Sequence, residues 1–202
     1  MSPPLLGDAQ GHYRIHIVGN SGVGKSTVGA QLAEILGVPY ISLDALFWKP
    51  GWEESSMDEF RQKVETALTA AQNGWVVDGN YINKLGSLLE ENETDIIWLD
   101  PPLALYLPRL IFRTVRRLLR TGPPCSEGCD ERLSQVLFSQ ESIIWWCLTQ
   151  HRPARRRETA NMARIGLGVG RDVENRKMRR LGGWGRELRA WLADVDRLVK
   201  DN

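Results

Sequence analysis

The chain has 202 residues, with 26 lysines and arginines against 25 aspartates and glutamates, and 42% of its residues are hydrophobic. This length suits one domain with a sizeable core, and a net charge of +1 gives no general attraction to nucleic acid or to a membrane surface. The sequence contains no run of about 18 apolar residues, so no transmembrane helix is predicted. The N-terminus lacks the pattern of a signal peptide. With only three cysteines, the sequence predicts a soluble protein of the cytoplasm.

In chain order, short apolar segments alternate with segments of helical spacing. We expect residues 1–12 to be a disordered tail and residues 13–202 to form a single domain. The segments predicted as strands are 14–18, 38–44, 74–81, 94–102 and 176–181. Those predicted as helices are 25–36, 56–71, 103–120, 132–148 and 184–199. Strands that alternate with helices imply right-handed crossovers, so the predicted fold class is α/β: a parallel sheet of about five strands with helices on both faces.

The segment between the first strand and the first helix has the pattern G-x-x-x-x-G-K-S. Its residues, with the one that follows, are Gly19, Asn20, Ser21, Gly22, Val23, Gly24, Lys25, Ser26 and Thr27. Backbone N–H groups must wrap a triphosphate closely, and glycines permit both the approach and the positive φ that such a loop needs. The helix N-terminus directs free N–H groups at the phosphates. This phosphate-binding loop predicts ATP as cofactor, with Lys25 on the β- and γ-phosphates and Ser26 on Mg²⁺.

With these residues in place, the chain resembles P-loop kinases of the adenylate kinase, shikimate kinase and gluconate kinase group. Within that group it is similar to the adenylate-kinase-like proteins known in bacteria as DNA topology modulation proteins. The resemblance is carried by "GNSGVGKST", "LDALFWKPGW", "WVVDGNY", "IIWLDPP" and a set of arginines with "EGC", over roughly residues 13–160. It implies a small acceptor-binding insertion at about 45–72 and a lid at about 121–135, both closing over the site.

By position, the resemblance assigns Asp78, at the end of the third predicted strand, to the metal site. A carboxylate there can hold the water shell of Mg²⁺ next to Ser26. Asp44, at the end of the second predicted strand, is implied to orient the acceptor hydroxyl and to accept its proton late in transfer. An aspartate that caps a turn is the alternative for both positions. Shikimate kinases carry an acid two residues before Asp44, where this chain has Ser42, so its site departs from a strictly shikimate-like one.

The same resemblance outlines an acceptor pocket. Arg61 resembles the arginine that binds an anionic group of the acceptor in these kinases, for which its planar fork is suited. An exposed arginine on a helix is the alternative. Trp48 and Trp52, in the aromatic loop after Asp44, are expected either to wall the pocket or to pack the insertion. The motif that follows Asp78 supplies the remaining expected acceptor contacts, which are Gly79, Asn80 and Tyr81.

Arginines are concentrated in two later segments. Arg109, Arg113, Arg116 and Arg120 recur at four, three and four residues, and so share one face of the predicted helix 103–120. The resemblance implies lid arginines here that neutralise charge on the transferring phosphoryl group, Arg109 and Arg113 first. A solvated basic face is the alternative. The resemblance also implies phosphate-binding roles within a second basic group that follows the lid, with Arg152 and Arg156 first; its members are Arg152, Arg155, Arg156 and Arg157.

Two cysteines of the predicted lid are spaced as C-x-x-x-C. They are Cys125 and Cys129. Some adenylate kinases hold a zinc ion in the lid with four ligands, whereas only two candidate ligands are local here. We therefore expect reduced cysteines.

The function predicted from these residues is ATP- and Mg²⁺-dependent transfer of a phosphoryl group to a small acceptor. A nucleoside monophosphate and a polar hydroxy compound both suit an arginine and an aspartate that face the γ-phosphate. The alternatives are a nucleotide-gated regulatory ATPase, which the resemblance would link to nucleic acid, and a nucleotide-binding scaffold without turnover. The near-neutral charge and the lack of a nucleic-acid motif argue against the first. Retention of Lys25, Ser26 and Asp78 argues against the second. The sequence leaves the acceptor and the oligomeric state open.

Overall fold

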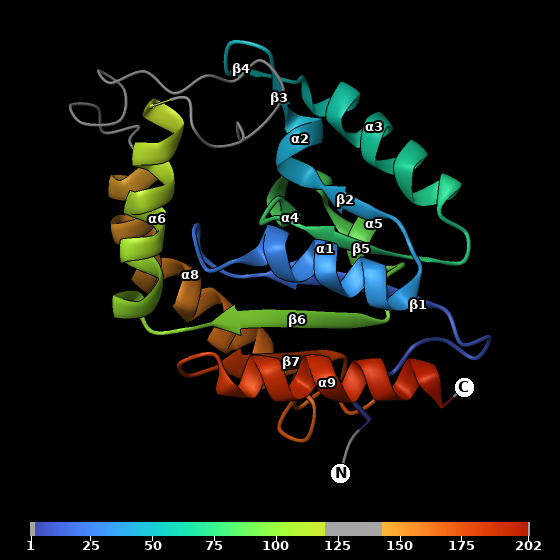
Figure 1. Cartoon of the computed structure of the whole chain (residues 1–202). Helices are drawn as coiled ribbons and strands as arrows, with labels where there is room; N and C mark the ends of the chain where they lie inside the picture. Colours follow the sequence, from blue (N-terminus) through green and yellow to red (C-terminus); the bar gives the residue numbers. More distant parts are fainter. Residues whose placement is uncertain (1–2, 120–142, 202) are drawn as a thin grey trace.

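The structure is a computed structural model of the chain, and it describes residues 3–119 and 143–201 (Figure 1). The predicted lid at 121–135, Arg120, Cys125 and Cys129 lie outside the described residues. The described elements are β1 (Tyr13–Val18), α1 (Lys25–Leu36), β2 (Tyr40–Ser42), α2 (Leu43–Phe47), β3 (Trp48–Lys49), β4 (Glu53–Glu54), α3 (Met57–Ala70), β5 (Gly74–Asp78), α4 (Ile82–Leu85), α5 (Ser87–Glu90), β6 (Asp95–Asp100), α6 (Leu103–Leu118), α8 (Ile143–Ile165), β7 (Met178–Gly182) and α9 (Arg186–Lys200). None of these helices is long and apolar enough to cross a membrane.

Five of the strands form one parallel sheet in the order β2-β5-β1-β6-β7. The prediction of a five-stranded parallel sheet with helices on both faces is thereby confirmed. The P-loop strand β1 lies in the centre, between β5 and β6. Ligands of such sheets collect at the carboxyl ends of the strands, so the segments that follow β1, β2, β5 and β6 share one edge. The short strands β3 and β4 form a separate antiparallel hairpin.

Side chains of the central strands alternate between the two faces of the sheet, because successive Cβ atoms of a strand point in opposite directions. On one face, Ile15, Ile17 and Ile97 pack in a cluster with α1 and α9, which lie side by side (Figure 1). On the other face there are two smaller clusters. The α3 cluster contains Ile41, Leu43, Phe47, Phe60, Val64, Ala71, Trp75, Val77, Leu85 and Leu89. The α8 cluster contains Val18, Ile96, Trp98, Ile165 and Met178.

The helices begin and end where local chemistry favours it. Helix α1 ends at Gly37, whose φ of 65° allows its N–H to bond the last turn of the helix. Helix α3 begins after Ser56, whose hydroxyl accepts a hydrogen bond from the N–H of Glu59. Phe60 and Val64 lie on its buried face. The bounds of α1 and α3 therefore agree with the prediction to within one residue.

The N-terminal segment differs from the prediction of a disordered tail. Its residues 3–7 contact the domain, where Leu5 is 2% exposed, whereas residues 9–11 are exposed. The carboxylate of Asp95 accepts hydrogen bonds from the N–H groups of Leu6 and Gly7, at 2.8 and 3.1 Å. The indole of Trp191 donates to the carbonyl oxygen of Pro4. A buried leucine and buried polar partners offset the entropy that a free tail would keep.

Two other predicted elements are corrected by the structure. The predicted strand 38–44 ends at Ser42, and Asp44 lies in the first turn of helix α2 instead of at a strand end. The change occurs because Leu43 and Phe47, four residues apart, are both buried in the α3 cluster, which favours a helical turn. The predicted helix 132–148 continues, within the described residues, to Ile165.

Candidate active site

The phosphate loop connects β1 to α1 at the carboxyl edge of the sheet. Gly19, Gly22 and Gly24 have φ values of 146°, 84° and 99°, as predicted for a loop that wraps an anion. At Gly19 a Cβ atom would lie 2.6 Å from the carbonyl oxygen of Leu99, so a larger residue would also clash with β6. The backbone N–H groups of residues 22–26 donate to no acceptor among the described residues. They are free to bind an anion at the N-terminus of α1.

Lys25 is the first residue of α1, and its side chain turns back over the loop. Its ammonium donates to the carbonyl oxygens of Gly19 and Asn20, each at 3.1 Å. Burial lowers the pKa of Lys25, and the nearby positive charge of Arg113 acts in the same direction. The carboxylates of Asp44 and Asp78 oppose this shift. The charges of both predicted acids and of one predicted arginine therefore act on the ammonium of the loop.

Asp78 ends β5, as predicted, and both of its carboxylate oxygens have protein donors. The hydroxyl of Ser26 donates to Oδ2 at 3.0 Å, and the hydroxyl of Tyr40 donates to Oδ1 at 2.9 Å. Asp78 is 2% exposed, and burial raises its pKa despite Lys25 and these two hydrogen bonds. A hydroxyl and a carboxylate 3.0 Å apart are hard oxygen ligands of the kind that Mg²⁺ binds, so the residues present fit that ion.

We expect Asp78→Asn to raise the Mg²⁺ concentration at half-maximal activity by about tenfold, because the variant keeps the shape of the side chain and removes its charge. A titration of activity with Mg²⁺ measures this shift. Tyr40→Phe is the matched control, because it removes one hydrogen bond to Asp78 and leaves the carboxylate in place. An Asp78→Asn titration that coincides with that of the wild type would show that Asp78 is structural.

Asp44 lies on α2, and its carboxylate is held by Tyr81. The phenol of Tyr81 donates to Oδ1 of Asp44 at 2.7 Å. The ring of Tyr81 packs against Phe47 and Phe60, with ring centroids 5.0 and 5.2 Å apart. Tyr81, packed on two phenylalanines of the insertion, thus holds the predicted catalytic carboxylate. Sequence reasoning placed Tyr81 in the acceptor site, and the structure connects it to Asp44.

The predicted aromatic loop contains a hairpin as well as α2. Trp48 and Trp52 are half-buried and meet edge to face, with ring centroids 5.5 Å apart. Trp48 also packs edge to face on Phe47. Arg61 is exposed on α3, directly after Phe60. These contacts agree with packing of the insertion, and the role of Trp48, Trp52 and Arg61 in binding an acceptor stays a prediction.

The turn after Asp78 joins the two halves of the site. Gly79 has a φ of 138°, and a Cβ atom there would lie 2.8 Å from that of Leu43, next to Asp44. The side-chain amide of Asn80 donates to the carbonyl oxygen of Gly19 at 2.7 Å and accepts from its N–H at 3.3 Å. Asn80 therefore clamps the first residue of the phosphate loop.

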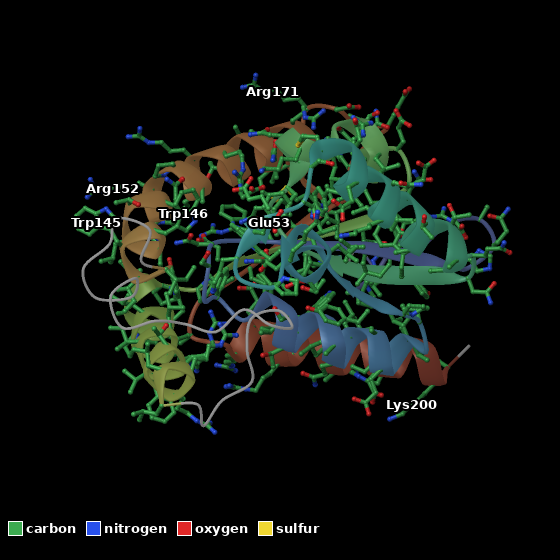
Figure 2. All side chains as sticks on the ribbon, turned by 90° about the horizontal axis from the view of Figure 1, so that it is seen from above. Glu53, Trp145, Trp146, Arg152, Arg171 and Lys200 are labelled. Carbon is green, nitrogen blue, oxygen red and sulfur yellow. The ribbon has the colours of Figure 1, made fainter. Side chains whose placement is uncertain are left out.

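The arginines lie on α6 and α8, which pack together. Arg109 and Arg113 are exposed on α6, and Arg113 is the one whose charge acts on Lys25. Arg152 lies on α8 near Trp145 and Trp146 (Figure 2), and Arg156 follows it by one turn; both are exposed. Proximity to the loop is therefore supported for Arg113, and the roles of the other three arginines stay predictions.

Sequence reasoning missed a buried network behind the loop. The side-chain amide of Asn20 donates to the carbonyl oxygen of Cys147 at 2.8 Å and to the hydroxyl of Tyr106 at 3.0 Å. The Tyr106 hydroxyl lies 2.7 Å from Nδ1 of His151. Burial raises the pKa of Tyr106 to about 12. These contacts tie the loop to α6 and α8. The only local signal was an asparagine at the second position of the loop.

Comparison with known proteins finds similar sequences and a similar solved structure among small-molecule kinases. The shikimate kinase family model matches residues 21–160. A shikimate kinase of Sulfurihydrogenibium sp. (strain YO3AOP1) is 33% identical over 120 residues, which are 52% of this chain and 71% of that protein. A shikimate kinase of Thermosynechococcus vestitus is 28% identical over 153 residues, or 68% and 79% of the two chains. The crystal structure of a gluconokinase from Sinorhizobium meliloti 1021 has a TM-score of 0.48 and 18% identity, with 94% of each chain covered.

Proposed function

The chain belongs to the shikimate kinase family and is a P-loop kinase, and we propose that it transfers the γ-phosphoryl group of ATP to a small acceptor that carries both a hydroxyl and an anionic group. The observation that carries this proposal is the position of two acids beside the phosphate loop, where the charges of Asp44 and Asp78 both act on Lys25. Asp78 accepts a hydrogen bond from Ser26 of the loop, and Asp44 accepts one from Tyr81, whose ring packs on the insertion. Two acids with separate supports suit two tasks, metal binding and orientation of a hydroxyl.

In this proposal each residue has one task. The loop N–H groups and Lys25 bind the phosphates. Ser26 and, through water, Asp78 would hold Mg²⁺, which neutralises charge on the phosphates when it is bound. Asp44 orients the acceptor hydroxyl and accepts its proton, and Arg61 binds the anionic group of the acceptor. The remaining acceptor contacts are proposed from Trp48, Trp52, Gly79, Asn80 and Tyr81.

The acceptor can be identified by a coupled assay of ATP consumption with a panel of acceptors. The panel contains adenosine monophosphate, shikimate and gluconate. ATP consumption stimulated by a nucleoside monophosphate would indicate an adenylate-kinase-like activity. Stimulation by a hydroxy acid would indicate an activity like that of the family. Ser42 in place of a second acid argues against a strictly shikimate-like site. If no acceptor stimulates turnover and DNA binds in a salt-sensitive way, the regulatory ATPase suggested by the likeness to DNA topology modulation proteins is supported instead.

We expect Arg113→Ala to lower kcat on the order of tenfold with little change in the KM for ATP. A cation near the transferring phosphoryl group stabilises charge that grows in the transition state, and exposure of Arg113 to water moderates this effect. Steady-state kinetics measure both constants. Arg109→Ala tests the other predicted lid arginine on the same helix face. An unchanged kcat in both variants would show that this face of α6 is only a solvated basic surface.

A further inference from the structure

His16 is a buried polar residue in the central strand of the sheet. It is 1% exposed and lies in β1, between Val77 of β5 and Ile96 of β6 in the register of the strands. Val77 belongs to the α3 cluster and Ile96 to the α8 cluster. An apolar residue would fill this position at lower cost, because a buried polar group must be fully hydrogen-bonded to be tolerated. The imidazole therefore requires an explanation beyond packing.

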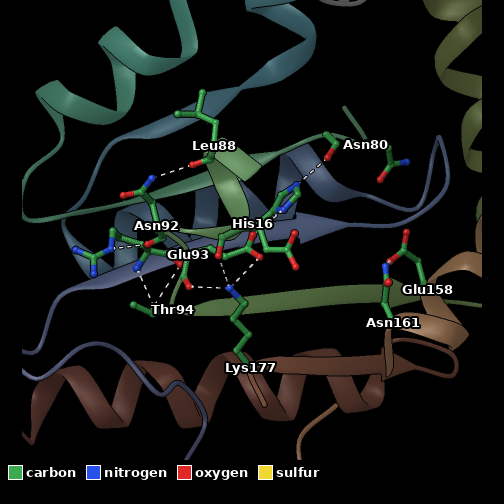
Figure 3. Close-up of polar contacts among 12 residues, drawn as sticks. His16, Asn80, Leu88, Asn92, Glu93, Thr94, Glu158, Asn161 and Lys177 are labelled. Carbon is green, nitrogen blue, oxygen red and sulfur yellow. Dashed lines mark hydrogen bonds and ion pairs between the residues drawn. The ribbon is translucent and has the colours of Figure 1, made fainter. Parts of the chain in front are cut away.

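Both ring nitrogens of His16 have partners that accept hydrogen bonds (Figure 3). Nε2 lies 2.9 Å from the carbonyl oxygen of Gly79, which can only accept. Nδ1 lies 3.0 Å from Oε2 of Glu93. The other carboxylate oxygen of Glu93 is 3.3 Å from the ammonium of Lys177, which favours an ionised carboxylate. The imidazole therefore donates through both nitrogens, as an imidazolium does.

The electrostatic surroundings agree with this assignment. Burial lowers the pKa of His16, but the hydrogen bond to Glu93 and the charges of Glu93 and Glu158 outweigh burial and raise it above its ordinary value. Burial raises the pKa of Glu93, but His16 and Lys177 together hold it below its ordinary value. Glu158 lies on α8 and is itself hydrogen-bonded by Arg157 and Asn161 (Figure 3). These surroundings favour the protonated ring, which keeps a hydrogen on Nε2 for the Gly79 carbonyl oxygen.

The carbonyl that His16 holds belongs to the turn on which the active site depends. Gly79 lies between Asp78, which bonds Ser26, and Asn80, which clamps Gly19. The N–H of Gly79 donates to the carbonyl oxygen of Ile17 at 3.3 Å, and its carbonyl accepts from His16. The peptide that leads into Asn80 is thus fixed from inside the sheet.

We propose that His16 is a positioning residue of the phosphate site, which holds the Gly79 carbonyl so that Asn80 keeps Gly19 in place at the start of the loop. Its effect on nucleotide affinity rests on the proposed function, whereas its effect on the order of the loop does not. A purely structural role predicts only a loss of stability on substitution. A positioning role predicts that one lost hydrogen bond matters to the loop and the other does not.

Two substitutions at His16 separate these roles. His16→Gln places an amide donor near the position of Nε2, so it retains the bond to Gly79 and loses the bond to Glu93. His16→Asn places its amide near the position of Nδ1, so it retains the bond to Glu93 and leaves the Gly79 carbonyl without a donor. Both variants lose the imidazolium and one buried hydrogen bond. Asn80→Ala removes the clamp itself and leaves the His16 network intact.

The experiment measures two properties of each variant. Hydrogen exchange, read by mass spectrometry on peptides that cover residues 17–25 and 78–82, reports the order of the loop and of the turn without any nucleotide. The affinity for a fluorescent ATP analogue with Mg²⁺ reports the consequence for binding. We expect His16→Asn to speed exchange in both peptides and to weaken affinity about tenfold. Asn80→Ala should speed exchange in the loop peptide and weaken affinity similarly, and His16→Gln should stay near the wild type in both measurements.

Specific results would overturn the proposal. If His16→Asn and His16→Gln change exchange and affinity equally, in proportion to their loss of stability, His16 is a core residue only. If His16→Asn does not fold, the test rests on the other variants: wild-type exchange in the loop of Asn80→Ala would remove the connection between turn and loop. If the wild type binds no nucleotide, the proposed function fails, and the exchange measurements still decide the role of His16.

Discussion

Lys25→Ala is expected to lower kcat by at least about a hundredfold while the chain keeps its fold. Phosphoryl transfer is catalysed by positioning and by stabilisation of charge, and loss of one well-placed donor to the reacting oxygens commonly costs this much. The ammonium of Lys25 already lies over the loop, 3.1 Å from two of its carbonyl oxygens. Alanine is a good helix former, so the first turn of α1 should persist.

This result is measured by ATP turnover together with circular dichroism. Lys200→Ala is a suitable control, because Lys200 lies near the end of α9, paired with Asp196 on the protein surface. Its turnover should match that of the wild type. Wild-type turnover in Lys25→Ala would show that the loop does not serve as a catalytic phosphate site.

Asp44→Asn is expected to lower kcat about a hundredfold with little change in the KM for ATP. General base catalysis commonly contributes this factor or more, and asparagine keeps the shape of the side chain without its basicity. Tyr81→Phe tests the support of this carboxylate. It removes the hydrogen bond of 2.7 Å and keeps the ring packed on Phe47 and Phe60, so the loss should be smaller, about tenfold.

The kinetic pattern of a neighbouring variant distinguishes catalysis from acceptor binding. Arg61→Ala should raise the KM for the acceptor and leave the KM for ATP nearly unchanged, because a contact with an anionic group exists in the ground state and in the transition state alike. If Arg61→Ala disturbs ATP and not the acceptor, the acceptor pocket has been assigned to the wrong side of the loop. If Asp44→Asn leaves kcat unchanged, Asp44 serves only to hold Tyr81 at the first turn of α2.

The part of the site that could be predicted is the part encoded locally. The phosphate loop needs glycines, a lysine and a helix in one continuous segment, and Asp78 follows from the end of a buried strand. Asp44 was assigned to a strand end because the segment 38–44 is apolar and short, whereas burial of Leu43 and Phe47 against α3 produces a helical turn. Tertiary packing decided that segment, and no local pattern reports it.

Two further features depend on partners distant in sequence. His16 meets Glu93, 77 residues away, so its role is invisible along the chain. Helix α8 runs past Pro153, which removes one helical hydrogen bond and normally argues for a break. Its buried residues, Cys147, Ala154, Glu158 and Ile165, offset that loss by packing along the sheet and α6.

The separation of the α3 cluster from the large cluster under α1 has an evolutionary consequence. The residues that support Asp44 and Tyr81 pack among themselves, while Lys25 and the loop rest on α1, α6 and α9. Effects of substitutions in separate clusters tend to add. Mutations in the insertion are therefore expected to disturb the phosphate site little, except at Leu43, which packs against the turn that holds the loop. Lineages of this fold can diverge in the molecule that they phosphorylate while they keep the same site for the phosphoryl donor. Laboratory selection for a new acceptor would best randomise the residues of the α3 cluster that lie in the insertion, together with the β3–β4 hairpin.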